Sequence, residues 1–308
     1  MGGPLLAIDG PLVAYRAFHS LPDSIRGADE RPVNAVLGSV NAVLGMVEAV
    51  SPRVTVWCLG AETAPHRSTR VPVYHSRRPP MPQDLARQMA LAAEVFGALG
   101  VLCLDAADPA LLGDVLEADD LMASLAAAET AAGGATVLAT ADRDLLATVD
   151  DRVSMLLMRP RREAVLLDAG GVERETGVTP ALLGDLKALA GDPSDDLPGA
   201  PGIGPKTAIE LLRRHGDLEG VIAAARTAAA AQSMGPAKRA SICDHADDLR
   251  AFRDAIALVV RPIGRPADRP IDRVAGAEAA RRLGMGALAR RLDGSASAAS
   301  ARRTAPRR

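Results

Sequence analysis

Short apolar runs alternate along the first half of the chain with longer segments in which apolar residues recur every three or four positions. The short runs predict buried strands at residues 4–8, 53–58, 100–104, 136–139 and 153–158. The longer segments predict helices at about residues 34–50, 83–99 and 117–132. This alternation is typical of an α/β fold with a doubly wound, mostly parallel sheet that carries helices on both faces.

The strand pattern stops near residue 178, and the remainder of the chain is helical in character. Thr179 is a favourable N-cap and Pro180 a favourable first helical residue, so a helix is predicted from there to about Ala190. After a Pro/Gly-rich connection, further helices are predicted at about residues 205–214, 217–231, 236–260 and 276–293. We therefore expect an α/β domain over residues 1–178, a helical subdomain over 179–294 and a disordered basic tail over 295–308.

Composition and charge favour a globular protein and argue against a membrane-spanning or secreted one. The chain has 308 residues, 48% of them hydrophobic, and a formal net charge of −2. No apolar run reaches the length of a membrane span, and no basic stretch precedes the first apolar run as it would in a secretory signal. The three cysteines lack the spacing of metal ligands, which suits free thiols in a reducing compartment. We expect a cytoplasmic, nucleoid-associated monomer with no membrane partner and no obligate protein partner.

Carboxylates gather where strands end and helices begin. Asp9 ends the first apolar run, and Asp142 and Asp144 follow the fourth. The string Glu117-Ala118-Asp119-Asp120 opens a helix, although the helix dipole alone also favours acids there. Because the carboxyl ends of parallel strands meet at one edge of a sheet, these acids are expected to share a crevice. Their mutual repulsion predicts bound divalent cations and chemistry on phosphodiesters.

A glycine turn in the second half carries the most specific local signal. Asp192 and Asp195 precede the string Gly202-Ile203-Gly204-Pro205-Lys206-Thr207. A Gly-x-Gly turn that opens a helix presents backbone N–H groups to a phosphate, although such a turn alone is often a plain connection between helices. The chain has only three lysines, and Lys187 and Lys206 flank the turn. Phosphate binding is the favoured interpretation.

Taken together, these strings resemble the 5′-nuclease (flap endonuclease) superfamily, in particular the 5′→3′ exonuclease domain of bacterial DNA polymerase I in a free-standing form. The matching strings are Ile8-Asp9-Gly10, Ala14-Tyr15-Arg16-Ala17-Phe18, Pro32-Val33-Asn34-Ala35-Val36, Glu117-Ala118-Asp119-Asp120, Thr140-Ala141-Asp142-Arg143-Asp144-Leu145-Leu146, Gly177-Val178-Thr179-Pro180, Gly191-Asp192 through Ala208, and Gly216-Asp217-Leu218-Glu219. They occur in the family's order over about residues 4–260, and no polymerase portion follows.

The resemblance implies a PIN-like nuclease domain, a helical arch at about residues 61–100, and a helix–three-turn–helix that grips duplex DNA. It implies two Mg²⁺ or Mn²⁺ ions held by Asp9, Glu117, Asp119, Asp120, Asp142, Asp144, Asp192 and Asp195. Asp9, Arg67 and Arg78 are expected to be catalytic. The residues expected to bind DNA are Arg77, Lys187, Gly202, Ile203, Gly204, Lys206 and Thr207. A monovalent cation in the helix–three-turn–helix is a further expectation.

Two positions depart from the family pattern. The family has an Asp after its second strand where this chain has Gly60, and a Lys at the base of the arch where this chain has His75. Glu62 and Arg77 are the nearby residues considered as replacements for the lost charges. A neutral imidazole stabilises a phosphate less than an ammonium does.

Three functions therefore stay open. The favoured one is a metal-dependent 5′→3′ exonuclease or 5′-flap endonuclease that acts on DNA with 5′ ends, flaps or nicks in replication or repair. The second is a weakened paralogue that binds branched or nicked DNA without cutting it. The third is a PIN-like ribonuclease, against which the long helical subdomain argues. The sequence does not separate exonuclease from flap-endonuclease preference.

Overall fold

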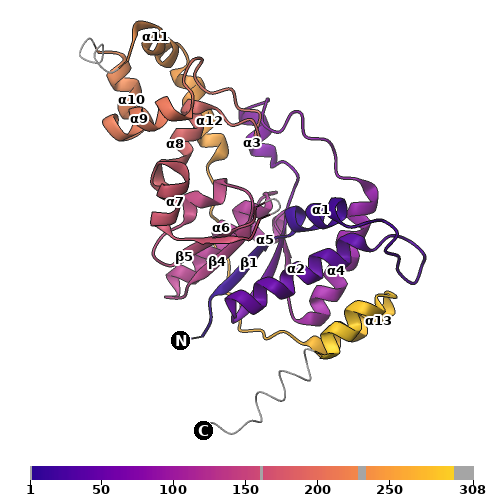
Figure 1. Ribbon diagram of the computed structural model, residues 1–308. Helices are drawn as coiled ribbons and strands as arrows, with labels where there is room; N and C mark the ends of the chain where they lie inside the picture. Colours follow the sequence, from indigo (N-terminus) through magenta and orange to yellow (C-terminus); the bar gives the residue numbers. More distant parts are fainter. Residues whose placement is uncertain (1, 160–161, 228–233, 295–308) are drawn as a thin grey trace.

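A central six-stranded sheet organises the first half of the molecule (Figure 1). The computed structural model describes residues 2–159, 162–227 and 234–294, so the predicted tail at 295–308 lies outside the described residues. The strands are β1 (Leu5–Asp9), β2 (Val54–Leu59), β3 (Leu102–Asp105), β4 (Thr136–Thr140), β5 (Val153–Leu157) and β6 (Val165–Leu167). Their order is β3-β2-β1-β4-β5-β6, and β6 alone runs antiparallel to its neighbour. The predicted doubly wound sheet is confirmed, and β6 is an addition too short to give a periodic signal.

Alternate residues of β1 face two separate cores, as the twofold period of a strand requires. Leu6 and Ile8 belong to a buried cluster formed with helices on one face. Leu5 and Ala7 belong to a second cluster, which continues into the helical half of the chain. The helices of the α/β half are α1 (Gly10–Ser20), α2 (Asn34–Val50), α3 (Pro65–Arg70), α4 (Gln83–Leu99), α5 (Pro109–Leu112), α6 (Ala118–Ala131) and the 3₁₀ helix η1 (Asp144–Thr148). Both faces of the sheet are thus covered.

The second half forms a helical subdomain beside the sheet (Figure 1). Its elements are α7 (Ala169–Thr176), η2 (Pro180–Leu182), α8 (Leu183–Ala190), α9 (Pro205–His215), α10 (Leu218–Ala225), α11 (Pro236–Asp244) and α12 (Ala246–Ile256). The single helix predicted at 236–260 is wrong, because the chain leaves helical geometry at His245 and divides into α11 and α12. The division lets α12 pack against both α8 and α3.

An extended segment at residues 257–272 returns from α12 to the α/β domain. The amide of Val259 donates to Asp120 Oδ1, the amide of Arg269 to the Arg53 carbonyl, and the amide of Asp272 to the Leu99 carbonyl. The segment then enters α13 (Arg273–Arg282), which packs on α4 and not on the helical subdomain. The helical subdomain expected over 179–294 therefore differs from the structure at its C-terminal end.

Among the described residues, no helix combines the length and apolarity that crossing a membrane requires.

Candidate active site

The carboxyl ends of β1 and β4 form the floor of an acidic crevice. Asp9 is the last residue of β1 and also the N-cap of α1, where its Oδ1 accepts the Leu12 amide at 3.0 Å. Thr140 ends β4 and donates its hydroxyl to Asp9 Oδ2 at 2.7 Å. The same hydroxyl oxygen accepts the amide of Asp142 at 2.9 Å. Thr140, which sequence analysis did not single out, thereby joins the acids of two strands.

Three acids in this crevice repel one another; we name them the inner acidic group, Asp9, Asp119 and Asp142. Burial, with a contribution from Asp142, raises the pKa of Asp9 to about 6. Burial followed by the charges of Asp142 and Asp9 raises the pKa of Asp119 well above its ordinary value. Burial likewise raises the pKa of Asp142, and the charge of Lys187 only partly opposes it. The group needs additional positive charge to be fully ionised near neutral pH.

A second set of acids already has a cation; we name it the lysine-paired group, Asp144, Asp192 and Asp195 with Lys187. The ammonium of Lys187 contacts Asp144 Oδ1, lies 2.5 Å from Asp192 Oδ2 and 3.9 Å from Asp195 Oδ2. Burial would raise the pKa of Asp192, but Lys187 and the Ser194 hydrogen bonds lower it overall. Lys187, expected to bind DNA, is therefore turned into the crevice.

The lysine-paired carboxylates are suited to a divalent cation. One oxygen of each lies within 4.8 Å of the others. Asp144 Oδ1 and Asp195 Oδ2 are buried, and the ammonium of Lys187 is the positive charge beside both of them. Hard divalent cations prefer such a set of carboxylate oxygens. The residues thus fit a metal, which has to displace or share the position of Lys187.

Two of the predicted metal ligands are committed to other partners. Asp120 is completely buried and receives both guanidinium nitrogens of Arg67, at 2.8 and 2.6 Å. It also accepts the amides of Glu117 and Val259. Glu117 accepts the amide of Ala64 at 2.7 Å. The structure therefore differs from the expectation that Asp120 binds metal and that Arg67 faces the substrate, because each neutralises the other out of reach of solvent.

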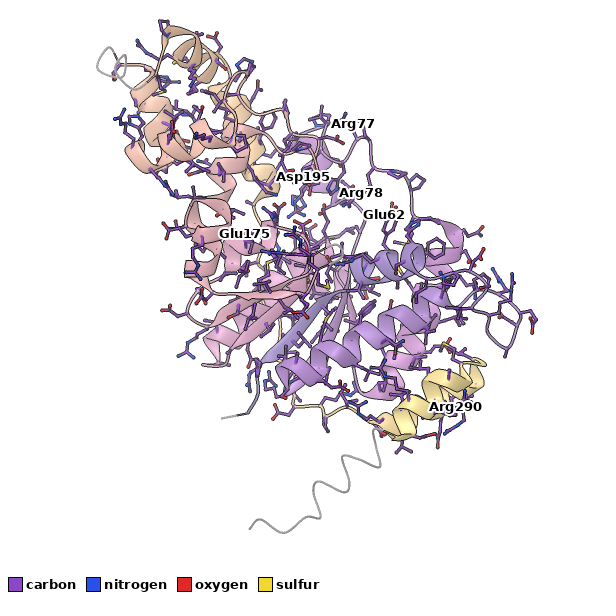
Figure 2. All side chains as sticks on the ribbon, viewed as in Figure 1. Glu62, Arg77, Arg78, Glu175, Asp195 and Arg290 are labelled. Atoms are coloured by element: carbon purple, nitrogen blue, oxygen red, sulfur yellow. The ribbon has the colours of Figure 1, made fainter. Side chains whose placement is uncertain are left out.

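The arch segment, which we define as residues 61–82, folds down over the crevice. Tyr74 donates its hydroxyl to Glu117 Oε2 at 3.2 Å, and His75 Nε2 lies 3.2 Å from Asp195 Oδ1. Arg78 donates to the Glu62 carbonyl, and its positive charge opposes in small part the burial that raises the pKa values of Asp9 and Asp142. Figure 2 shows Arg78 close to Glu62 on the arch segment. The rest of the predicted arch, α4, is instead packed in a core of the α/β domain.

Gly60 leaves no room for the carboxylate that the family pattern has there. A Cβ atom at this position would lie 2.3 Å from the Ala118 amide nitrogen and 2.5 Å from the Glu117 carbonyl carbon. The start of α6 therefore lies directly against the end of β2, and the amide of Ala61 donates to the Leu116 carbonyl. Glu62 does not replace the missing acid, because its side chain accepts the Met81 amide at the surface.

The glycine turn before α9 presents an exposed edge of the helical subdomain. Gly202 has a φ of +78°, Gly204 is the N-cap of α9, and Lys206 is exposed in the first turn. Ile203 is buried and its amide bonds to the Ala200 carbonyl, so that amide is not offered to a phosphate. The Thr207 hydroxyl accepts a hydrogen bond from the ammonium of Lys238 at 3.5 Å. The exposed donors therefore lie at Gly202, Gly204 and Lys206.

Solved structures share this architecture. The T5 D15 protein, co-crystallised with metal ions, aligns with a TM-score of 0.66 and 15% identity, covering 94% of this chain and 97% of that one. The catalytic core of Rad2 in complex with DNA substrate aligns with a TM-score of 0.58 and 16% identity, covering 95% and 91%. At such identities the likeness shows the fold alone. The fold is that of flap nucleases.

Sequence comparison then defines the family. The model of the 5′-3′ exonuclease N-terminal resolvase-like domain matches residues 4–177, and that of the 5′-3′ exonuclease C-terminal SAM fold matches residues 178–262. A 5′-3′ exonuclease of Streptomyces coelicolor is 33% identical over 234 residues, covering 71% of this chain and 74% of that protein. The thermostable DNA polymerase I of Thermus aquaticus is 34% identical over 252 residues, covering 82% of this chain but 28% of the polymerase. The chain belongs to the 5′-3′ exonuclease family, a family of metal-dependent nucleases.

Proposed function

We propose that this protein hydrolyses DNA phosphodiesters at or near 5′ ends with two Mg²⁺ or Mn²⁺ ions and releases 5′-phosphate products. One observation supports this most directly. Six acids from β1, α6, β4–η1 and the loop after α8 form one cluster, and burial together with the charges of neighbouring acids raises the pKa values of three of them.

Each residue in the proposal has a distinct task. Asp9, Asp119 and Asp142 would hold one ion, and Asp144, Asp192 and Asp195 would hold the other in place of the Lys187 ammonium. The ions supply Lewis acidity and a nucleophilic water at neutral pH. Arg78 orients the phosphate above the acids. Arg67 does not touch substrate and keeps Glu117 and Asp120 in place.

The helical subdomain supplies the grip on the duplex. The exposed turn at Gly202 and Gly204 offers backbone N–H groups, and Lys206 adds a charge at the positive end of α9. Such phosphate contacts are independent of base sequence, which suits recognition of ends, flaps and nicks by shape. This part of the molecule is what a small PIN-like ribonuclease would lack.

A second function deserves a test because Gly60 excludes a carboxylate by sterics. A protein that binds branched or nicked DNA without cutting it would keep the helical subdomain and lose metal-dependent turnover. The two functions differ in product formation and agree in DNA binding. They are therefore separated by measuring both.

The experiment uses a labelled 5′-flap and a labelled nicked duplex with Mg²⁺, Mn²⁺ or EDTA. Cleavage that stops in EDTA supports the nuclease. The Asp119→Asn variant is expected to lose at least about a thousandfold in rate while its DNA affinity in EDTA is unchanged. Asp114→Asn, an exposed acid outside the crevice, is the matched control. Binding without products in either metal selects the non-catalytic function.

A further inference from the structure

The arch segment is docked on the helical subdomain by its own small core. Val71 and Tyr74 pack with Leu197, Ala255 and Ile256 in a buried cluster separate from the two main ones. Ion pairs surround this cluster. Arg70 pairs with Asp254, and Arg67 donates to the carbonyls of Ala255 and Ala257 at the end of α12. The base of the arch is thereby fixed without any nucleic acid.

The tip of the arch is fixed differently, by one acid beside the crevice. Arg77 donates its amide to Asp196 Oδ2 at 3.0 Å and its Nε to Asp196 Oδ1 at 2.6 Å, while Nη2 lies 2.5 Å from the same oxygen. The Arg77 side chain is 78% exposed and that of Asp196 only 10%. Asp196 directly follows Asp195, so the Arg77–Asp196 pair lies next to the lysine-paired group.

A guanidinium binds carboxylate and phosphate oxygens with the same forked geometry. We propose that Asp196 is a resident substitute for a phosphodiester: it occupies Arg77 in free protein, and a DNA phosphate that reaches the crevice displaces it. Asp196 is a positioning residue that acts through Arg77. This inference rests on the proposed function, because it supplies the phosphate ligand of a site on the arch.

Charge balance gives the exchange a measurable signature. In the parent protein Arg77 is already neutralised, so binding a phosphate there exchanges one anion for another. Without the acid, Arg77 is free to neutralise a DNA phosphate, and that contact releases the counterion condensed on the phosphate. Removing the Asp196 charge therefore strengthens DNA binding and steepens its salt dependence by up to about 0.9 in the slope of log K against log [salt].

Asp196→Asn is a suitable variant because it removes the charge and keeps the shape. Residue 196 has a φ of +61°, a left-handed conformation that Asn adopts readily. Asp254→Asn is the matched control, since it also removes an acid that is paired to an arch arginine, Arg70. The control leaves the Arg77 pair intact.

Affinity for a nicked duplex is measured in EDTA for the parent, Asp196→Asn, Arg77→Gln and the double variant. We expect Asp196→Asn to bind about two- to fivefold more tightly, the range that an exposed ion pair represents. Asp196→Asn is expected to add nothing in the Arg77→Gln background. An equal gain in both backgrounds, or the same gain from Asp254→Asn, overturns the proposal because the acid would act only as general negative charge. No gain overturns it as well.

Hydrogen exchange of arch peptides without DNA keeps the two hypotheses apart. Faster exchange at residues 71–78 in Asp196→Asn than in Asp254→Asn supports the tether between the arch and the loop at Asp196, whether or not the parent binds DNA. If the parent does not bind DNA, that result counts against the proposed function alone. Unchanged exchange together with unchanged affinity overturns the tether.

Discussion

The inner acidic group and the lysine-paired group lie side by side and consist of the same residue type, aspartate. They differ in how their negative charge is compensated. Asp9, Asp119 and Asp142 face one another, and burial raises their pKa values. Asp192 is buried as well, but its contact with Lys187 and Ser194 lowers its pKa. The charge of Lys187 also acts on Asp142, but the pKa of Asp142 is still raised. At Asp192 a contacting cation outweighs burial, whereas in the inner acidic group burial and neighbouring acids outweigh the more distant positive charges.

Asp120 is a third case, because its charge is neutralised by the buried guanidinium of Arg67. Removing the Asp120 charge should have the largest effect on stability. Asp120→Asn leaves the Arg67 guanidinium buried with only Glu117 nearby. We expect a loss of about 3–5 kcal/mol in the free energy of unfolding, measured by urea denaturation in EDTA. Asp114→Asn, which breaks an exposed pair with Arg261, should cost less than about 1 kcal/mol. Equal losses of stability in the two variants would show that the buried Arg67–Asp120 pair contributes no more than an exposed pair.

The inner acidic group should make the metal-free protein less stable as the pH rises. The pKa of Asp9 is about 6 in the folded protein against an ordinary 3.8, so the folded state holds this proton more tightly. Its contribution to stability is full below pH 4 and is lost as the pH rises through 6. Asp9→Asn should therefore match the parent at pH 4 and exceed it above pH 6 by up to about 3 kcal/mol in EDTA. Equal stabilities at pH 8 would contradict the assignment.

Lys187 should behave as a cation that a metal replaces. Lys187→Met leaves Asp144, Asp192 and Asp195 without their ammonium, so we expect the metal-free protein to lose about 2 kcal/mol. Mn²⁺ should then raise the melting temperature of the variant more than that of the parent, since it no longer competes with the lysine. Lys206→Met, which removes an exposed lysine, serves as control. The same Mn²⁺ effect in all three proteins would argue against competition.

The smallest effect is expected far from the acids, at the helical subdomain. Lys206→Ala should weaken duplex binding in EDTA by several-fold and reduce the salt slope by about 0.9, because one phosphate contact is lost. Its melting temperature should be unchanged, since Lys206 is exposed. Undiminished affinity would remove this turn from the binding surface and leave the crevice as the main contact.

Much of this arrangement follows from sequence pattern. The period of two in β1 and the position of Asp9 at its end place that acid at the sheet edge before any coordinates are known. The same holds for Asp142 after β4. These inferences work because strand direction and the edge of a parallel sheet are fixed by local rules.

The partners of the charges could not be predicted in the same way. Lys187 was expected to face DNA and Arg67 to face substrate. Instead, Arg67 pairs with Asp120, 53 residues later in the chain, and Lys187 pairs with Asp144, which lies in the other half of the chain. Steric closure at Gly60 also depends on where α6 begins relative to β2. Such contacts arise only from tertiary packing.

The returning segment at 257–272 has a consequence for how the chain is divided. It leaves α12, returns to the α/β domain and presents Arg265 to Glu129, which Arg53 also contacts from the residue before β2. The two family models meet at residues 177 and 178, yet a fragment ended there would lack one of the two arginines around Glu129 and all of α13. Separate expression of the halves should therefore give insoluble N-terminal material, whereas co-expression should restore a single particle.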